Sequence, residues 1–348
     1  MPPNMQKYLY QQRDFPIFQN RMYETPDEAQ NCPKGDIDLV EDTKTGLVYN
    51  AAFRPELMVY DRHYQNEQAV STFFKQHLKA VANLIAVHIG RESLVEVGCG
   101  KGFFLEMLLG EGFDITGFDP AYEGANQRIQ KRYFEPGIID HTSGLILRHV
   151  LEHIQRPVDF LHKLKEVVGK GRIYIEVPCL DWICRHRAWF DIFYEHVNYF
   201  RLTDFGRIFG EVIDSGRLFG GQYLYVIADL STVRDPQINS NDRVNFPAHF
   251  TRNLVEQNIT AIWGGASKGV ILCLLKAREG KPVSMVIDIN PAKQSKYLAG
   301  TGLQVLSPEA AAGLLPPGSS IYVMNSNYIE EIRDLTNNAF NLIAIDDE

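Results

Sequence analysis

The stretch Leu94-Val-Glu-Val-Gly98-Cys-Gly100-Lys-Gly102-Phe-Phe-Leu-Glu-Met-Leu108 decides the fold of the chain. It predicts a short strand that runs through a glycine turn into a helix. Glycine tolerates the backbone conformations of such a turn and lets a ligand approach the N-terminus of the helix closely. Dinucleotide sites use the spacing G-x-G-x-x-G, whereas the spacing here is G-x-G-x-G, preceded by the acidic Glu96. A carboxylate at this position would repel a pyrophosphate and suits a cationic amino group.

Strands and helices alternate on both sides of this turn. Apolar runs predict strands at 94–97, 113–118, 145–150 and 172–177, with helices at 101–109 and 151–168. A long amphipathic helix is expected over 70–85, where apolar residues recur every three or four positions. Such alternation predicts a parallel sheet with helices on both faces, and the near-continuous apolar strands agree with burial on both sides.

A second alternation follows the polar stretch 229–258, which we interpret as a connection between domains with a helix near its end. Strands are predicted at 259–263, 283–288, 321–324 and 341–345. The expected fold class is therefore α/β, with two Rossmann-like doubly wound sheets and a small N-terminal cap. The first 60 or so residues look irregular. The predicted domains are the cap at 1–68, a first Rossmann-like domain at 69–230, and the connection with a second Rossmann-like domain at 231–348.

Composition excludes several classes of protein. The 348 residues are 45% apolar, which supports two or three domains with real cores. With 35 basic and 43 acidic residues the formal charge is -8, which argues against nucleic-acid binding. No apolar run approaches the roughly 20 residues that span a membrane, and the N-terminus lacks a secretory apolar segment. Five scattered cysteines without a C-x-x-C pair favour a reducing cytoplasm over a disulfide scaffold.

Two later motifs join the glycine turn. Asp119 ends the next predicted strand, and Leu147-Arg-His149-Val-Leu-Glu152-His153 follows the strand after that. Together they resemble the class I S-adenosylmethionine-dependent methyltransferases, although Ser143-Gly144 stands near the place where that family usually has an Asp. The resemblance implies S-adenosyl-L-methionine as cofactor, S-adenosyl-L-homocysteine as product, and Asp119 as the acceptor of the ribose hydroxyls. The residues expected to bind the cofactor are Glu96, Gly98, Cys99, Gly100, Gly102, Phe103, Asp119, Pro120, His149, Glu152 and His153.

The segment His149-x-x-Glu152-His153 also matches the H-x-x-E-H pattern of zinc proteases. The methyltransferase motif accounts for the same residues in their proper place, so we expect no metal here. A direct role beside the sulfonium and a local role in capping and hydrogen bonding both stay open for Glu152 and His153.

The acceptor end is expected in Glu176-Val-Pro178 and in Phe190-Asp191-Ile-Phe-Tyr194-Glu195-His196, which Tyr199-Phe200 follows closely. Methylation of carbon needs a base of near-neutral pKa beside a group that stabilises an enolate. A histidine next to a carboxylate fits this task. The alternative is that His196 is a core histidine within an aromatic cluster.

These blocks resemble the C-methyltransferases that act on nucleotide-linked keto-deoxysugars. The resemblance implies that His196 is the base and Glu195 supports it. The Tyr of the family motif falls on Phe193 and its His on Tyr194, so the hydroxyl has moved by one residue or been lost. We list Tyr194 as the candidate hydroxyl. Glu176 and Tyr199 are expected to contact the acceptor, together with Tyr60, Tyr64 and Asn66 ahead of the long helix.

The resemblance extends to both ends of the chain. Gly264-Gly265-Ala-Ser267-Lys268-Gly269 looks like the family's C-terminal glycine turn, and Asp288-Ile-Asn290-Pro-Ala-Lys293 also matches. We expect Gly265, Ser267 and Lys268 to contact the nucleotide, since a helix N-terminus and a lysine favour a diphosphate. The family's N-terminal zinc unit needs four cysteines, and only Cys32 stands in this region, so no structural zinc is expected.

The leading interpretation is S-adenosylmethionine-dependent methylation of a carbon next to a ketone of a nucleotide-linked sugar. The alternative is an O- or N-methyltransferase for another small metabolite. A non-catalytic nucleotide-binding protein and an NAD(P) oxidoreductase fit the motifs less well. The expected partner is a small-molecule acceptor, with no nucleic acid and no membrane, and the expected location is the cytoplasm.

Overall fold

The computed structural model describes residues 6–58, 71–135, 137–138, 142–238, 241–251 and 259–346. Its largest sheet has seven strands in the order β11-β12-β9-β8-β5-β6-β7. The strands from β5 to β9 pair in parallel, whereas β12 and β11 add an antiparallel edge. The bounds are β5 (Leu94–Val97), β6 (Ile115–Phe118), β7 (Ile129–Gln130), β8 (Gly144–Arg148), β9 (Arg172–Pro178), β11 (Val212–Leu218) and β12 (Tyr223–Asp229).

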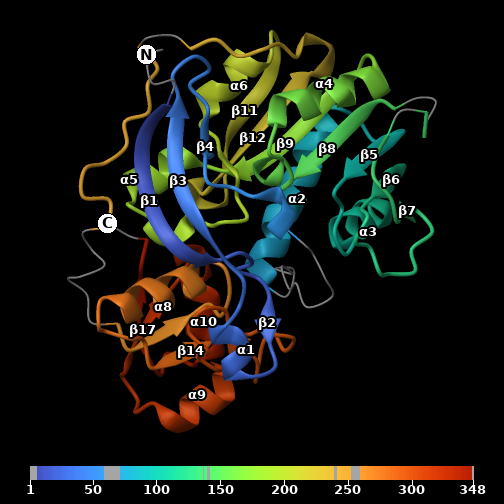
Figure 1. The fold of residues 1–348 in the computed structure, drawn as a ribbon. Helices are drawn as coiled ribbons and strands as arrows, with labels where there is room; N and C mark the ends of the chain where they lie inside the picture. The colour runs from blue at the N-terminus through green and yellow to red at the C-terminus, as the bar shows by residue number, and fades with distance from the viewer. Residues whose placement is uncertain are drawn as a thin grey trace.

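Helices cover both faces of this sheet, as the apolar strands predict (Figure 1). On β8, Ile146 packs with the cluster under the helices α2 and α3, whereas Leu145 and Leu147 pack with the cluster under α4, α5 and α6. Successive residues of a strand face opposite sides, so both sides of β8 are buried. The bounds are α2 (Thr72–His88), α3 (Phe103–Gly110), α4 (Pro157–Val168), α5 (Leu180–Arg185) and α6 (Leu202–Ile208).

The helix expected over 151–168 is interrupted. A single 3-10 turn, Leu151–His153, comes first, and α4 begins only at Pro157. Arg156 has φ -123° and ψ 78°, outside the helical region. The cause is Pro157, because the residue before a proline is kept out of the α conformation. The break leaves Glu152 and His153 on a short turn at the end of β8.

The second sheet confirms the second Rossmann-like alternation. Its five strands lie in the order β16-β14-β13-β17-β18 and all pair in parallel. Figure 1 shows this unit, coloured orange to red, below the larger sheet. The bounds are β13 (Ala261–Trp263), β14 (Met285–Ile287), β16 (Val305–Leu306), β17 (Ser320–Val323), β18 (Asn341–Ala344), α8 (Lys268–Arg278), α9 (Pro308–Leu314) and α10 (Ile329–Leu335).

The expectation of an irregular N-terminus is wrong. A four-stranded sheet in the order β1-β3-β4-β10 is built from β1 (Gln6–Pro16), β3 (Lys34–Asp42), β4 (Val48–Asn50) and β10 (Asn198–Tyr199). Irregular register between Tyr8 and Tyr10 and between Gln12 and Phe15 breaks the alternation of apolar and polar residues in β1. A strand without that alternation gives no periodic signal in the sequence.

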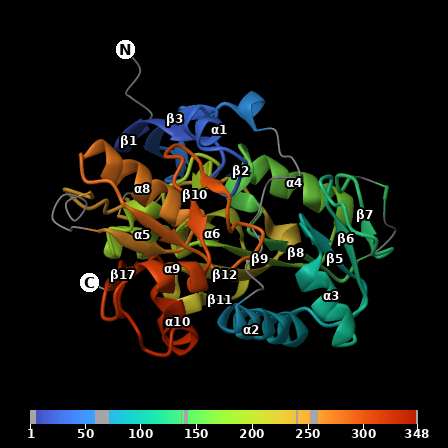
Figure 2. The same cartoon turned by 90° about the horizontal axis from the view of Figure 1, so that it is seen from below.

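The N-terminal segment contacts both Rossmann-like units. Strand β10 comes from the first unit and completes the N-terminal sheet, while β2 (Met22–Tyr23) pairs with β15 (Tyr297–Leu298) of the second. The short helix α1 (Pro26–Gln30) follows β2. Figure 2 shows β1, β3 and α1 on one side of the molecule, opposite α2 and α10. The segment therefore joins the two units.

Two remaining expectations concern the polar connection and the membrane. The connection packs on the N-terminal sheet, where Val244 N–H donates to Glu41 Oε1 at 3.0 Å. The helix expected near its end falls on 252–258, outside the described residues. No helix in the described ranges has the length and apolar character needed to cross a bilayer.

Candidate active site

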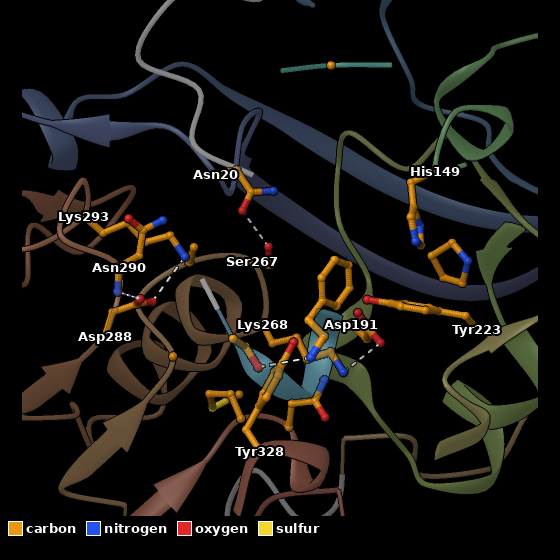
Figure 3. Close-up of a pocket in the computed structure, with 18 of the residues that line it drawn as sticks. Asn20, His149, Asp191, Tyr223, Ser267, Lys268, Asp288, Asn290, Lys293 and Tyr328 are labelled. Carbon is orange, nitrogen blue, oxygen red and sulfur yellow. Dashed lines mark hydrogen bonds and ion pairs between the residues drawn. The ribbon is translucent and has the colours of Figure 1, made fainter. Parts of the chain in front are cut away.

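A cavity of about 380 Å³ joins the two Rossmann-like units. Its wall combines the glycine turn after β5, the segment at the end of β8, the segment around His196 and the glycine turn after β13. In Figure 3, Asp288, Asn290 and Lys293 gather on the side of the C-terminal unit, and His149 and Tyr223 lie on the other side. Motifs that are far apart in the sequence thus line one space.

The first glycine turn presents Glu96 to this cavity. Glu96 is the third residue of β5 and is 3% exposed. Its Oε2 has no hydrogen-bond partner within the described part of the chain. Burial raises the pKa of Glu96 to about 7; nearby Arg148 opposes this and Asp119 adds to it. A buried carboxylate without a partner is costly, so its position at a cavity wall points to a cationic ligand group.

The glycines leave room for that ligand. Gly100 has φ +56°, a conformation that glycine adopts without strain, and a Cβ placed on it would meet no atom within 4 Å. Gly98, Cys99 and Phe103 also line the cavity. The cradle and the free Glu96 oxygen together fit S-adenosylmethionine, whose methionine part carries a cationic amino group.

Asp119 stabilises the glycine turn through hydrogen bonds to backbone N–H groups. Its Oδ2 accepts a hydrogen bond from Gly100 N–H and its Oδ1 accepts one from Ala121 N–H, each at 2.8 Å. Burial raises the pKa of Asp119, and these two hydrogen bonds oppose that effect. Asp119, Pro120 and Gly102 are not among the described residues that line the cavity. In this arrangement Asp119 shapes the turn, and its expected contact with ribose stays a prediction.

Behind the cavity wall lies a buried charge network centred on Glu176. Its Oε1 accepts from His77 at 2.9 Å and from Arg148 and His149 at 3.2 Å, and its Oε2 accepts from Tyr174 OH at 2.7 Å. Burial opposes ionisation of Glu176, but Arg148, His149 and His77 hold its pKa well below its usual range. Glu176 does not line the cavity, so it supports the wall instead of contacting the acceptor directly.

His149 connects this network to Glu152. Its Nδ1 lies 3.2 Å from Glu152 Oε1 and its Nε2 lies 3.2 Å from Glu176 Oε1. Burial lowers the pKa of His149, but the two carboxylates outweigh burial and raise it to about 9. The backbone at His149 has φ 52°, an uncommon value for a residue with a side chain. His149 is therefore a protonated imidazole that two carboxylates, Glu152 and Glu176, hold in place, and it also lines the cavity.

His196 lines the cavity beside His153 and Phe193. The ring centroids of His153 and His196 are 4.9 Å apart, and those of Phe193 and His196 are 4.8 Å apart. His196 Nδ1 is buried and has no hydrogen-bond partner among the residues described. Burial, followed by the charges of His153 and His149, holds the pKa of His196 well below its usual range. His196 is thus a neutral imidazole at neutral pH.

The structure does not bring Glu195 and Tyr194 to the cavity with His196. Glu195 Oε1 accepts from Gln19 N–H at 3.3 Å, and its carbonyl accepts from His153 Nδ1 at 2.8 Å. Tyr194 OH accepts from Arg54 N–H at 3.0 Å, on the side of the N-terminal sheet. Tyr194 and Glu195 lie in a bend of the backbone, so their adjacency to His196 in the sequence does not give a shared site. The supporting and oxyanion roles expected for these two residues lack the geometry they need.

Tyr199 also lies away from the cavity. Its hydroxyl donates to Phe193 O at 3.0 Å and accepts from Phe193 N–H at 2.8 Å. It therefore fixes the loop that carries His196. Tyr60, Tyr64 and Asn66 fall in 59–70, outside the described residues.

The polar groups of the second glycine turn already have partners in other parts of the protein. Gly265 N–H donates to Asp288 Oδ2 at 2.8 Å, and Ser267 Oγ donates to Asn20 Oδ1 at 2.7 Å. Lys268 Nζ lies 2.9 Å from Gln222 Oε1 and 3.3 Å from Asp191 Oδ2 (Figure 3). Ser267 and Lys268 line the cavity, whereas Gly265 stands behind it. The ammonium of Lys268 is therefore engaged by the first unit.

Several lining residues received no role from the sequence. Asp288 ends the second strand of its unit, as Asp119 does in the first, so the same rule of strand-end acids would have found it. Lys293 Nζ lies 3.2 Å from Asp288 Oδ2. Asn20 and Tyr223 have no signal in the sequence, because they reach the cavity only through the packing of distant segments.

One group in the described part of the chain has the spacing of metal ligands. Glu152, His153 and His196 each offer a ligand atom, and these atoms lie within 4.8 Å of one another. The donor set of one carboxylate and two imidazoles suits several divalent metals. The same three groups equally suit proton chemistry, and we do not assign them as metal ligands.

Comparisons with known proteins identify a methyltransferase domain in the chain. Residues 58–212 match the family model described as a methyltransferase domain. The C-methyltransferase NovU of Streptomyces niveus is 24% identical over 322 residues, which cover 78% of this chain and 76% of that protein.

Solved structures share part of the fold. The methyltransferase domain of bacterial CtHen1 is 16% identical, with a TM-score of 0.37, and covers 45% of this chain and 99% of that one. The plantazolicin methyltransferase BpumL, in complex with S-adenosylhomocysteine, is 13% identical, with a TM-score of 0.36. The match covers 46% of this chain and 86% of that one. Residues 58–212 are thus an S-adenosylmethionine-dependent methyltransferase domain, which contains the open glycine turn and the buried Glu96 Oε2 that has no hydrogen-bond partner in the described part of the chain.

Proposed function

We propose that the enzyme methylates a carbon next to a ketone of a nucleotide-linked sugar, with His196 as general base. The observation that carries this proposal is the shared cavity, whose wall includes Glu96, His196 and the second glycine turn with Ser267. A methyl donor, a base and a place for the far end of the acceptor are all needed in one space. The similarity to a protein described as a C-methyltransferase supports the type of reaction.

His196 has the lone pair that a base for this step requires, although its pKa lies below the near-neutral range expected from the sequence. It is neutral at neutral pH because burial and neighbouring imidazoles lower its pKa, so its lone pair can accept a proton. The proton moves from the carbon to a ring nitrogen, and the electron pair of the C–H bond becomes the enolate. When bound, S-adenosylmethionine supplies the methyl group that this carbon takes up. Glu96 and the cradle at Gly98, Cys99 and Gly100 would hold it.

The second unit would hold the nucleotide part of the acceptor. Ser267 and Lys293 line the cavity there, and both can donate hydrogen bonds to phosphate oxygens. Lys268 and Lys293 each have an acidic partner, Asp191 and Asp288 respectively, and Lys268 also donates to Gln222. Lys268 is therefore the more fully engaged of the two and contributes less than the sequence suggests. We therefore assign the diphosphate chiefly to the glycine turn and Lys293.

Methylation of oxygen or nitrogen in another small metabolite is the second candidate. Phe193, not a tyrosine, lines the cavity beside His196, and the hydroxyl of Tyr194 bonds elsewhere. A missing hydroxyl would leave the enolate oxygen with one donor fewer, which matters less for an O- or N-acceptor.

The test is a thermal-shift series with S-adenosylhomocysteine throughout and TDP, UDP, GDP, CDP or no nucleotide added. A ligand that binds the native state raises the melting temperature. A rise that is selective for one diphosphate supports a nucleotide-linked acceptor and identifies its nucleotide. A response to S-adenosylhomocysteine alone refutes the nucleotide part and favours the second candidate.

A further inference from the structure

We propose that Glu152, and not Glu195, is the carboxylate that positions His196 and stabilises its protonated form during turnover. The inference rests on the proposed function for the identity of the base. It concerns an acid far from the E-H pair in the sequence, on the 3-10 turn Leu151–His153 at the end of β8.

The first argument is the pair of unsatisfied atoms. Glu152 is 1% exposed, and its Oε2 has no hydrogen-bond partner in the ranges that the structure describes; the same holds for His196 Nδ1. A carboxylate oxygen of Glu152 and a ring nitrogen of His196 are within 4.8 Å. Both residues line the cavity. Two residues this close together, each with a buried polar atom that lacks a partner in the described part of the chain, form an incomplete pair that a proton or a small ring movement completes.

The second argument is that Glu152 is fixed in place. Its other oxygen, Oε1, lies 3.2 Å from His149 Nδ1, and His149 Nε2 lies 3.2 Å from Glu176 Oε1. Glu176 is bound in turn by Arg148, His77 and Tyr174. Figure 3 shows His149 at the cavity wall close to Tyr223, and their ring centroids are 4.6 Å apart. These contacts hold the Glu152 side chain in place through Oε1 and leave Oε2 without a partner in the described part of the chain.

The other charged groups around His196 have different partners. Glu195 Oε1 accepts from Gln19 N–H on the side of the N-terminal sheet. Asp191 lies 3.3 Å from the ammonium of Lys268. His153 directs Nδ1 to the carbonyl of Glu195, and because a carbonyl only accepts, that nitrogen carries the hydrogen. Glu152 is therefore the described carboxylate that faces His196 with an oxygen to spare.

The chemistry requires such a counter-ion. When His196 takes the proton from carbon, a cation forms in a buried place next to His153 and to the His149 cation. An uncompensated buried charge is costly, and a carboxylate within about 4–6 Å offsets that cost by favouring the charged form. The proton remains on His196 until it leaves to solvent.

The experiment compares Glu152→Gln with Glu195→Gln, two matched changes that each remove one carboxylate near His196. Histidine-selective NMR titration of the S-adenosylhomocysteine complex reads the pKa of His196 without any acceptor. We expect Glu152→Gln to lower the pKa of His196 by about one pH unit or more, and Glu195→Gln to change it by only a few tenths of a unit. With an accepted substrate, Glu152→Gln should reduce kcat about 100-fold and leave KM for S-adenosylmethionine within twofold.

An unchanged pKa of His196 in Glu152→Gln, or a larger fall in Glu195→Gln, overturns the proposal. A stoichiometric divalent metal that is lost to a chelator overturns it as well, since Glu152, His153 and His196 would then bind the ion. If Glu152→Gln does not fold, the wild-type protein still tests the proposal. The chemical shift of the Glu152 carboxyl carbon should change with an inflection at the pKa of His196, and His196→Asn should abolish that inflection. Because these readouts need no acceptor, a failure of the proposed C-methylation leaves them intact and distinguishable.

Discussion

The two Rossmann-like units contain the same kind of glycine turn, but the side chains around the two turns differ. In each, a strand runs into glycines and a helix, and an acid at the end of the next strand accepts a hydrogen bond from a glycine N–H at 2.8 Å: Gly100 to Asp119 in the first and Gly265 to Asp288 in the second. The residue two positions before the first glycine differs. It is Glu96 in the first unit and the apolar Ile262 in the second.

The surrounding charges differ in the same sense. The first turn offers a buried, unpartnered carboxylate oxygen within the described structure, whereas the second is flanked by Lys268 and Lys293, which lie 3.3 Å from Asp191 and 3.2 Å from Asp288. An acid selects a cationic ligand group, and lysines favour an anionic one. The scaffold thus fixes where a ligand lies, and one or two side chains decide the sign of its charge.

The largest effect should come from adding a side chain to Gly269, in the second turn, and it should be seen in the free energy of unfolding. A Cβ at Gly269 would lie 1.9 Å from the carbonyl oxygen of Gly264. Gly269→Ala should therefore cost about 3 kcal/mol of unfolding free energy through overpacking, measured by urea denaturation. In Gly100→Ala the new Cβ meets no atom within 4 Å, so the loss of stability should be about 1–2 kcal/mol, the strain of an alanine at φ +56°. The added methyl group occupies the space left for the ligand and should lower the affinity for S-adenosylhomocysteine. Equal denaturation midpoints for the two variants would contradict the comparison.

The next effect tests the charge of the first turn. Glu96→Gln removes the carboxylate but keeps the shape, and we expect S-adenosylhomocysteine affinity to fall about 100-fold, the size of a lost charge-assisted hydrogen bond. Isothermal titration calorimetry measures it, with the exposed Glu92→Gln as the matched control. A loss below about threefold would mean that the free oxygen of Glu96 does not meet the amino group.

A smaller effect tests the contact between the units. Lys268→Met leaves the buried Asp191 without its cation, and Asp191→Asn removes the matching charge. A double-mutant cycle on unfolding free energy should give a coupling of about 2 kcal/mol, since removing one partner strands the other. The double variant should then be more stable than Lys268→Met alone. Independent, additive losses would show that Lys268 is free for a ligand, as its sequence motif suggests.

The sequence predicted the two parallel sheets because buried parallel strands and glycine turns leave strong local signals. Glu96, Gly98 and Gly100 were found in this way, and they share a cavity with His196, which the E-H motif indicated. The N-terminal sheet was missed, because irregular register hides the alternation of β1 and because its strand β10 lies some 150 residues further along. Pairing over that distance leaves no local pattern.

The roles of side chains were harder to predict than their neighbourhood. Glu195 and Tyr194 adjoin His196 in sequence, yet their side chains bond to Gln19 and Arg54 of the N-terminal segment. Lys268 has the expected position, but Asp191 already engages it. In each case the deciding partner comes from a distant segment, and motif spacing carries no information on where that segment packs.

The smallest effect is the pH dependence of the first turn. Burial raises the pKa of Glu96 to about 7, so its carboxylate is mostly ionised at pH 8 and mostly protonated at pH 6. A cationic amino group binds the ionised form, and affinity for S-adenosylhomocysteine should therefore fall as the pH falls, by about tenfold between pH 8 and pH 6. Calorimetry at a series of pH values measures this, with ionic strength held constant.

The matched variant makes this last measurement specific to Glu96. Glu96→Gln has no proton to exchange, so its weaker affinity should be nearly flat over the same range. If the wild-type affinity were also flat, or if it rose toward pH 6, the carboxylate would not be the group that meets the ligand. Since Ile262 stands in the corresponding place, the second turn has no carboxylate like Glu96 to titrate. Any change in diphosphate binding over this range should follow the second pKa of the phosphate, about 6, and should be the same in the wild type and in Glu96→Gln.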